Sequence, residues 1–332
     1  MSLLSAKIDL NVTPTQNAIS GAISGVMARF ATAPLDVIKI RLQLQTTTTK
    51  VFEKGHSNYH KPKYQSIFQA GRLIIKEEGI LGLWKGNLSA LYLYLAYGAV
   101  QFAIFHEILN NSKKQDSFLA THIPQQAHTF IAGAISGCVS TVSTYPLDLL
   151  RTRFAVQRNN FYPSLTKAIK NIFVKEGISG FYRGMLPTLV QIIPQMGLIF
   201  ESHRIFVKLF KHLETKAPTV YKWTSGYSEI FCGAMAGVVT KVVVMSFDVI
   251  RKRYQVQGPM RNAIVVDNVP RYHRGIVHTA CQIVKHEGVL ALYKGIVPCL
   301  AKAAPGSAVT FFVVNECRLA FSQYNEMQQS KS

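Results

Sequence analysis

The sequence predicts an all-α membrane protein with six transmembrane helices, arranged as three tandem repeats around a central cavity. Hydrophobic residues make up 48% of the 332 residues and charged residues only 16%, which is a low charge content for a soluble protein. Long apolar runs occur in pairs, and one set of short motifs returns three times in the same order. Six such runs in three pairs favour a membrane bundle over the buried helices of a soluble protein.

Each repeat is defined by three motifs. The first motif ends an apolar run with a proline, an acid and two bases at fixed spacing: Pro34, Asp36, Lys39 and Arg41; Pro146, Asp148, Arg151 and Arg153; Ser246, Asp248, Arg251 and Arg253. An acid–glycine pair and an aromatic–base–glycine triplet follow: Glu78-Gly79 and Trp84-Lys85-Gly86; Glu176-Gly177 and Tyr182-Arg183-Gly184; Glu287-Gly288 and Tyr293-Lys294-Gly295. These motifs predict three repeat domains at residues 14–112, 125–214 and 225–324.

Within each repeat the hydropathy pattern predicts a long helix, a short charged helix and a second long helix. The predicted spans are residues 17–42 and 86–109, 128–155 and 184–210, and 228–255 and 295–320. Residues 86–105 and 129–147 contain no charged side chain, and such runs are long enough to cross a bilayer. The segments between paired spans place their apolar residues on one face, which is typical of short helices in the membrane interface: residues 66–79, 165–177 and 276–288.

Pairs of glycines four residues apart lie in the first span of each repeat: Gly21 and Gly25, Gly133 and Gly137, and Gly233 and Gly237. Small residues at this spacing let membrane helices approach closely. We therefore expect these pairs to mark helix–helix contacts.

Composition and motif content exclude several classes of protein. The net charge is +20, which can reflect nucleic acid, anionic lipid or an anionic ligand. The bases flank apolar spans, so we do not expect nucleic-acid binding. The five cysteines show no CxxC spacing and the histidines form no HExxH, so we expect neither a disulfide, a metal nor a cofactor. The sequence also has no P-loop and no catalytic cluster, so we do not expect an enzyme.

The threefold motif resembles the signature of the mitochondrial carrier family. The resemblance covers nearly the whole chain and implies a multi-pass monomer in the mitochondrial inner membrane, with both termini in the intermembrane space. It also implies short helices on the matrix side, where cardiolipin is expected to bind. Proline at the motif's first position interrupts the helical ladder and kinks the helix toward the central axis. Pro34 and Pro146 keep this residue, whereas Ser246 replaces it and is expected to bend its helix more gently by bonding to the main chain.

The resemblance implies a gate at the matrix end of the cavity. An acid and a base three residues apart lie on one helix face. The family pattern pairs each acid with the first base of another repeat: Asp36 with Arg151, Asp148 with Arg251, and Asp248 with Lys39. In the family a glutamine beyond the bases braces each pair; Gln43 and Gln255 hold that place and Ala155 does not, so two braces are expected. Alternatively, these charges form a solvated helix end with bases that anchor it in the interface.

Three bases lie within the apolar spans and predict the substrate class. A base at mid-bilayer costs roughly 2.5–3.5 kcal/mol, so it usually faces a cavity. Arg29 and Lys241 each lie seven residues before a motif acid, on the same helix face. Lys302 lies at a family substrate-contact position. The family's contact positions also fall on Thr141, Leu93, Tyr97, Gln191, Ile192, Gln195 and Gly306.

Three bases with no acid among them imply an anionic substrate, and a compact diphosphate suits them. Alternatively, some of these bases snorkel to the interface or bind lipid phosphate. The residues 33–45, 145–157 and 247–257 are most similar to the fungal family members that carry thiamine pyrophosphate. This resemblance implies import of thiamine pyrophosphate into the matrix by alternating access, in exchange for another phosphorylated compound. Adenine nucleotides, deoxynucleotides and coenzyme A remain alternative substrates, and an uncoupling channel or a non-transporting relative is an alternative role.

Overall fold

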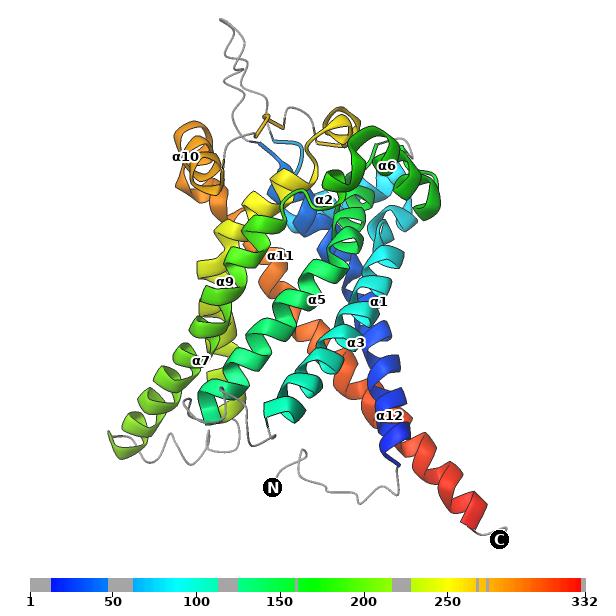
Figure 1. Cartoon of the computed structure of the whole chain (residues 1–332), viewed down its shortest axis with the longest axis vertical. Helices are drawn as coiled ribbons and strands as arrows, with labels where there is room; N and C mark the ends of the chain where they lie inside the picture. The colour runs from blue at the N-terminus through cyan, green and yellow to red at the C-terminus, as the bar shows by residue number, and fades with distance from the viewer. Residues whose placement is uncertain are drawn as a thin grey trace, which may run out of the picture.

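The structure is a computed structural model that describes residues 13–46, 62–112, 125–158, 161–216, 228–266, 269–272 and 275–329. In this described part of the chain, six long helical rods surround a central axis (Figure 1). They are α1 (Pro14–Leu44), α3 (Asn87–Ser112), α5 (Gln125–Val156), α7 (Met185–Lys216), α9 (Ser228–Gln255), and α11 (Ile296–Ala301) continued by α12 (Ala303–Gln329). This arrangement confirms the predicted all-α fold of three helix pairs.

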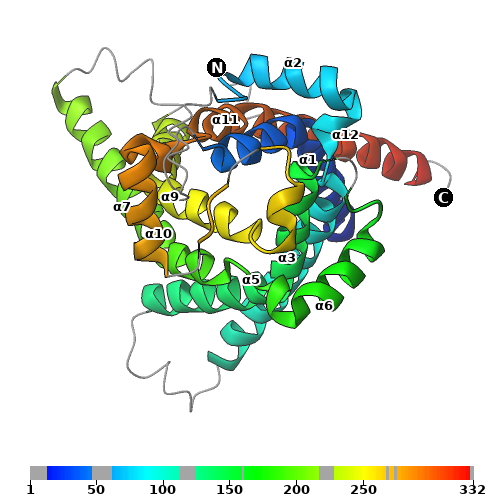
Figure 2. The same cartoon turned by 90° about the horizontal axis from the view of Figure 1, so that it is seen from above.

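Three short helices gather at one end of the rods: α2 (Ile67–Glu78), α6 (Leu165–Phe181) and α10 (Ile276–Glu287). Figure 2 shows them at the periphery of the bundle, outside the long helices. We call this end the short-helix end. The 3-10 turns η1 (Ile80–Trp84), η2 (Pro259–Ala263) and η3 (Val289–Tyr293) lie there too. The helix α1 begins, and α12 ends, at the opposite end of the bundle (Figure 1).

The ring of helices is closed by contacts between repeats. The helix α3 of the first repeat packs against α5 of the second, α7 of the second against α9 of the third, and α12 of the third against α1 of the first. The repeats therefore form one closed bundle, and each of the three seams between repeats is built in the same way.

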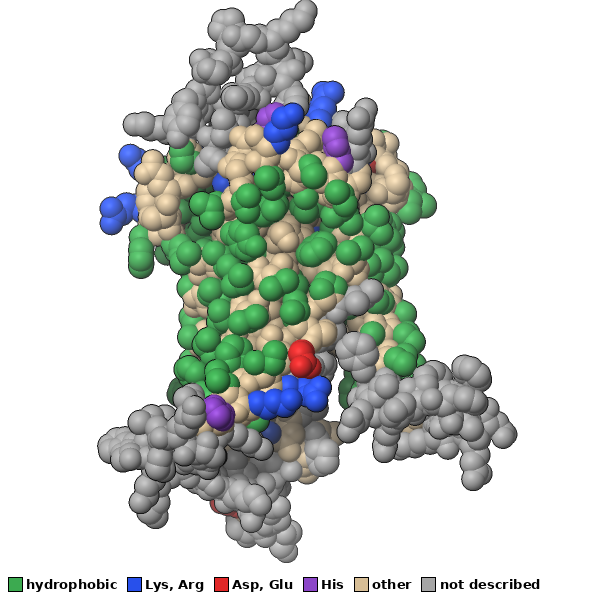
Figure 3. Space-filling model, turned by 90° about the vertical axis from the view of Figure 1, so that its left-hand side faces the viewer, with side chains coloured by type: hydrophobic (Ala, Val, Ile, Leu, Met, Phe, Trp, Pro, Cys, Tyr) green, Lys and Arg blue, Asp and Glu red, His purple; other side chains and the backbone are tan. Residues whose placement is uncertain are grey.

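The outer surface of the bundle suits a lipid environment. In Figure 3 hydrophobic side chains form a broad band, with lysine and arginine side chains at its two ends. Among the described residues, three helical segments are both long and apolar enough to cross a membrane: residues 80–110, 231–255 and 289–327. The helices α1, α5 and α7 contain 31 or 32 residues, which at 1.5 Å per residue also exceeds the thickness of the hydrocarbon core.

The second base of each first motif stabilises the short-helix end. The guanidinium of Arg41 is fully buried, pairs with Glu78 of α2, and donates to the backbone oxygen of Ala155 in the next repeat, with Nε 3.0 Å from that oxygen. Lys85 of the aromatic–base–glycine motif forms an ion pair with the same carboxylate, with its Nζ atom 2.7 Å from the nearer oxygen. The same clamp recurs in the other repeats: Arg153, Glu176 and Arg183; Arg253, Glu287 and Lys294. The three motifs are therefore parts of one repeated ion-pair clamp.

Two of the clamp carboxylates, Glu78 and Glu287, are held ionised. Burial alone would raise the pKa of Glu78, but the hydrogen bond and charge of Arg41 outweigh it and hold the pKa below its ordinary value. The pKa of Glu287 is lowered in the same way, against the effect of burial, by Arg253 and Lys294. These shifts stabilise the charged pairs over the pH range in which unperturbed glutamates are ionised.

The glycine of the aromatic–base–glycine motif permits close approach between repeats. Gly86 has a φ of +81°, and a Cβ atom added there would lie 2.6 Å from the backbone oxygen of Arg151. Gly184 and Gly295 have the same left-handed conformation against α9 and α1. A side chain at these positions would clash and strain the backbone. The motif therefore brings the start of each second helix against the helix of its neighbour that carries the acid and bases.

The glycine pairs were expected at helix contacts. The structure corrects this for the first and third repeats, whereas in the second repeat a Cβ added at Gly137 would lie 3.7 Å from the hydroxyl of Tyr97 on α3. A Cβ added at Gly21, Gly25, Gly233 or Gly237 meets no atom within 4 Å. These four glycines instead line the open central cavity. In this conformation they widen the cavity rather than mediate helix packing.

Several long helices contain residues that disturb the helical hydrogen-bond ladder. Pro34 and Pro146 lie inside α1 and α5, and the hydroxyl of Ser246 donates to the Val243 carbonyl at 3.5 Å. The predicted main-chain bond of Ser246 is therefore present but long. The last rod is interrupted between α11 and α12 at Lys302. Pro305 follows three residues later and cannot donate to the preceding turn, which accounts for this break.

Candidate functional site: a basic cavity above an ion-pair ring

A central cavity of about 1260 Å³ opens between the long helices. A second cavity of about 360 Å³ lies next to it, toward the short-helix end. The two share lining residues: Lys39, Tyr94, Gln195, Lys241 and Lys302. We call the second cavity the floor cavity, because the ring of motif acids and bases lines it.

All ten predicted substrate-contact residues line one of these cavities. Arg29 and Gly306 line the central cavity, and Lys241, Gln195 and Lys302 line both. The remaining five line the floor cavity: Thr141, Leu93, Tyr97, Gln191 and Ile192. Residues from all three repeats therefore meet around one space, as the sequence predicted for a shared hollow.

Charge in the cavities is strongly unbalanced. Of the residues that the structure describes, seven basic side chains line them: Arg29, Lys39, Arg151, Lys241, Arg251, Lys252 and Lys302. Three acidic side chains of this described part do so, and they are the motif acids Asp36, Asp148 and Asp248. The formal excess of four positive charges favours an anionic ligand over a cationic one.

The structure corrects the prediction that the three substrate bases have no acid among them. Arg29 pairs with Asp36, seven residues along α1. The Nζ atom of Lys302 lies 2.8 Å from the other carboxylate oxygen of Asp36. Two of the three bases are therefore held by an acid of the predicted gate, and an anion must compete with Asp36 for them.

Lys241 is in a different position. Among the described residues no carboxylate lies within 4.0 Å of its amine, although Asp248 is near enough to act on it electrostatically. This base lies on α9 and lines both cavities. It is consequently the base most available to an incoming anion.

The three predicted ion pairs between repeats are all present. The distance from the side-chain nitrogen to the nearest carboxylate oxygen is 3.1 Å for Arg151 and Asp36, 2.7 Å for Arg251 and Asp148, and 3.1 Å for Lys39 and Asp248. We call these six residues the ion-pair ring. Their side chains are between 4% and 18% exposed, so the ring is buried and is not the solvated helix end considered as an alternative.

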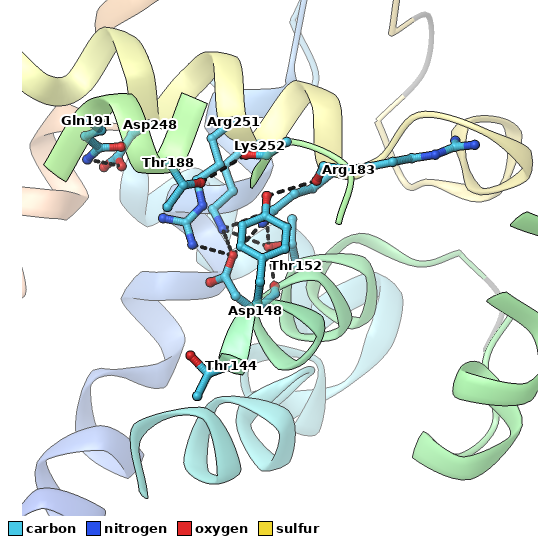
Figure 4. A network of polar contacts seen from close by, with 12 residues as sticks. Thr144, Asp148, Thr152, Arg183, Thr188, Gln191, Asp248, Arg251 and Lys252 are labelled. Carbon is cyan, nitrogen blue, oxygen red and sulfur yellow. Dashed lines mark hydrogen bonds and ion pairs between the residues drawn. The ribbon is translucent and has the colours of Figure 1, made fainter. Parts of the chain in front are cut away.

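The pair at Asp148 is reinforced by residues that the sequence analysis did not select. Figure 4 shows Arg251 and Lys252 pointing toward Asp148. The Nζ atom of Lys252 lies 3.4 Å from the carboxylate, 2.8 Å from the hydroxyl of Thr152 and 2.9 Å from the amide oxygen of Gln255. Lys252 is thus a fourth base in the ring. Aligning the repeats would have revealed it, because Ile40 and Thr152 hold the equivalent places.

Only one of the two expected glutamine braces is formed. Gln255 donates to Asp148 and, at 3.2 Å, to the hydroxyl of Tyr145. The amide of Gln43 is fully buried, and neither its nitrogen nor its oxygen has a hydrogen-bond partner among the described residues. The prediction of two braces is therefore wrong for Gln43, since the side chain does not reach the Lys39–Asp248 pair.

A link of a different kind joins the substrate positions to the ring at Asp248. The amide nitrogen of Gln191, on α7, donates to Asp248 at 2.9 Å, as Figure 4 shows. Together with Arg29 and Lys302 at Asp36, this places three predicted substrate-contact residues in direct contact with ring acids. A ligand that engages these residues must alter the ring.

Comparison with known proteins identifies the class. The family model for mitochondrial carrier proteins matches residues 11–115, 124–214 and 222–325. The chain therefore belongs to the mitochondrial carrier family, and it is a multi-pass transporter of the mitochondrial inner membrane rather than an enzyme.

Similar proteins are known from several fungi. A protein of Neurospora crassa described as mitochondrial thiamine pyrophosphate carrier 1 is 42% identical over 307 residues, which cover 90% of this chain and 89% of the relative. Proteins of Aspergillus terreus and Coccidioides immitis with the same description are 40% identical over 305 residues and 39% identical over 315 residues. These alignments cover 92% and 94% of this chain, and 91% and 94% of the two relatives.

Proposed function

We propose that this protein imports thiamine pyrophosphate into the mitochondrial matrix. Lysine and arginine side chains of the central cavity bind its diphosphate. The observation that carries the proposal is the convergence of three bases from two repeats on the central cavity: Arg29 lines this cavity, and Lys241 and Lys302 line both it and the floor cavity. The similarity to fungal carriers described as transporting this compound supports the same substrate. Charge-assisted hydrogen bonds to a diphosphate are stronger than neutral ones.

The transport step follows from competition for shared bases. The diphosphate binds Lys241 first. It then contacts Arg29 and Lys302, which are paired with Asp36 when no substrate is bound. When the phosphates take over these two bases, Asp36 keeps only Arg151. Substrate binding thereby leaves one base in place of three to hold Asp36 at this link of the ion-pair ring, and the ring can open toward the matrix. Binding energy is thus spent on opening, as alternating access between two states requires.

The return step needs an anion as well. Without a ligand, Arg29 and Lys302 go back to Asp36 and the ring closes. Because the cavities carry four excess positive charges, the conformational change that turns the cavity back away from the matrix is easier when a second phosphorylated compound is bound. We therefore propose exchange, rather than one-way uptake, as the normal mode.

Two proposals concern the surroundings of the carrier. The three repeats of one chain close the helix ring around the cavities through the α3–α5, α7–α9 and α12–α1 contacts, which supports a monomeric transport unit. The helices α2 and α6 begin at Ser66 and Ser164, whose side chains cap them, and helix N-termini attract anionic groups. This supports cardiolipin binding on the matrix side. Native mass spectrometry of the detergent-solubilised protein measures both the subunit number and retained lipid.

Uptake into proteoliposomes tests the substrate. The purified carrier is given labelled thiamine pyrophosphate, ADP, dATP or coenzyme A, with vesicles empty or preloaded with unlabelled compound. We expect fastest uptake of thiamine pyrophosphate and faster uptake into preloaded vesicles. Arg29→Ala and Lys302→Ala are each expected to reduce this uptake roughly tenfold, since each removes a charged hydrogen bond. Arg72→Ala, an exposed base on α2, is the control. Preferred uptake of a nucleotide or coenzyme A contradicts the proposal.

A further inference from the structure

Tyr94 has an unusual position between the two cavities. It lies on α3, it lines both the central cavity and the floor cavity, and its side chain is half exposed. Because it belongs to both linings, part of its ring faces the space where a substrate would lie. An aromatic ring at such a place is available to a ligand as well as to the protein.

Two positive charges already lie over this ring. The guanidinium carbon of Arg29 is 5.1 Å from the ring centroid of Tyr94, and that of Arg151 is 5.9 Å away. Both distances fall within the range of cation–π attraction. The ring of Tyr94 is therefore a site at which this protein accumulates positive charge, and Arg29 is shared between the ring and Asp36.

The proposed substrate carries a cation of its own. In thiamine pyrophosphate a two-carbon linker joins the diphosphate to a thiazolium ring, which has a permanent positive charge. When Arg29 and Lys302 bind the diphosphate, the short linker keeps the thiazolium ring near Arg29. Arg29 in turn lies over the ring of Tyr94. As the phosphates draw the guanidinium of Arg29 toward them, one cation leaves the ring of Tyr94.

We propose that Tyr94 is a specificity-determining residue: its ring binds the thiazolium cation that replaces Arg29 when the diphosphate enters. The inference rests on the proposed function and deepens it. The bases recognise any diphosphate, while Tyr94 distinguishes a diphosphate that bears a cation from one that bears a neutral group. ADP and coenzyme A lack a permanent cation next to the diphosphate, so they gain nothing from this ring.

The test compares ligands that share the diphosphate and differ in whether a cationic ring is attached to it. Inhibition constants against uptake of labelled thiamine pyrophosphate are measured for thiamine pyrophosphate, its neutral thiazolone analogue and inorganic pyrophosphate. The carriers compared are the wild type, Tyr94→Trp, Tyr94→Phe and Tyr94→Leu. Tyr92→Leu, the same change at an exposed residue that lines neither cavity, is the control.

We expect the wild type to prefer the cationic ligand over the thiazolone roughly fivefold, a typical cation–π effect. Tyr94→Phe keeps this preference, Tyr94→Trp increases it, and Tyr94→Leu removes it. Inhibition by inorganic pyrophosphate stays within twofold in all variants. Because Trp and Leu change the preference in opposite directions, the Trp variant still decides the question if the Leu variant does not fold.

Two results overturn the inference and leave the proposed function intact: a wild type that does not distinguish the two ligands, or a preference that survives in Tyr94→Leu and does not grow in Tyr94→Trp. A wild type that takes up no thiamine pyrophosphate defeats the proposed function itself. The two failures are therefore separate observations.

Discussion

The ion-pair ring is built from three equivalent pairs, yet two of its links differ sharply. At the seam between repeats 2 and 3, Asp148 receives Arg251, Lys252 and Gln255. At the seam between repeats 3 and 1, Asp248 receives Lys39 and Gln191. The repeated motif sets which residues pair, whereas residues outside the motif decide how firmly each pair is held.

Backbone contacts strengthen the same seam. The segment after α9 crosses to repeat 2, where the amide of Val265 donates to the Val156 carbonyl and the amide of Arg158 to the Ala263 carbonyl, both at 2.8 Å. Met260, next to this crossing, is fully buried. Repeats 2 and 3 are thus tied at the short-helix end by side chains and by backbone. The comparison indicates that the seams open unequally, with the Asp248–Lys39 link weaker than the Asp148–Arg251 link.

The largest expected effect separates the two acids. Asp148→Asn leaves Arg251 and Lys252 buried side by side without a carboxylate, and breaking a buried ion pair in this way costs roughly 3–5 kcal/mol. Asp248→Asn releases Lys39 and removes the attraction that Asp248 exerts on Lys241, but both lysines line the central cavity and are flexible enough to turn into it. We expect a clearly lower unfolding temperature in detergent for Asp148→Asn than for Asp248→Asn. Equal unfolding temperatures would show that the links do not differ.

Exchanging the charges across each seam sharpens the comparison. Lys39→Asp combined with Asp248→Lys restores an ion pair, so this double variant should transport several-fold better than either single variant. Asp148→Arg combined with Arg251→Asp places an arginine next to Lys252, and like charges repel there. We expect no recovery at this seam. The recovery is measured as proteoliposome uptake by the two double variants and the four single variants. Equal recovery at both seams contradicts the role given to Lys252.

The two glutamines give a smaller effect. Gln255→Leu removes hydrogen bonds to Asp148, Lys252 and Tyr145, and leaving buried groups unpaired costs roughly 1–3 kcal/mol each. Gln43→Leu removes an amide that has no partner among the described residues, so it should leave stability unchanged or raise it. Thermal unfolding of both variants measures the difference. A larger loss for Gln43→Leu would restore the second brace.

The smallest effect concerns the clamps at the short-helix end, which the repeats share. The pKa of Glu78 is lowered from its ordinary 4.5, so its contribution to stability is complete above that value and is lost as the pH falls below it. The dependence of unfolding temperature on pH should therefore flatten below pH 4.5 in Glu78→Gln. The control is Glu77→Gln, which removes a partly exposed pair with Lys63. An unchanged pH profile in Glu78→Gln contradicts the clamp.

The sequence predicted the repeat, the six helices and the three ion pairs because these follow from motifs that occur three times. It did not predict what breaks the symmetry. Lys252 stands in a variable position of the motif, and the motif does not encode that the buried amide of Gln43 is left without a partner among the described residues. The pairing of Arg29 and Lys302 with Asp36 was also missed. Lys302 lies on a helix far away in the sequence, so only the closed ring brings it to that acid.

The same reasoning explains the glycine pairs. Their spacing is compatible with close helix contact, but in this structure four of them line the cavity. A pattern that permits contact does not say in which conformation the contact forms. Sequence alone could identify these residues as special without assigning them to one state of the transport cycle.

The most direct test of the account measures the affinity of the isolated carrier for inorganic pyrophosphate when Asp36 is changed to Asn. Asp36 competes with the ligand for Arg29 and Lys302, so removing its charge should tighten pyrophosphate binding, by roughly tenfold for two released bases. Asp148→Asn breaks a ring link without releasing a substrate base and should not tighten it. Titration calorimetry in detergent gives both dissociation constants. Equal or weaker binding in Asp36→Asn would contradict competition between the ring and the substrate.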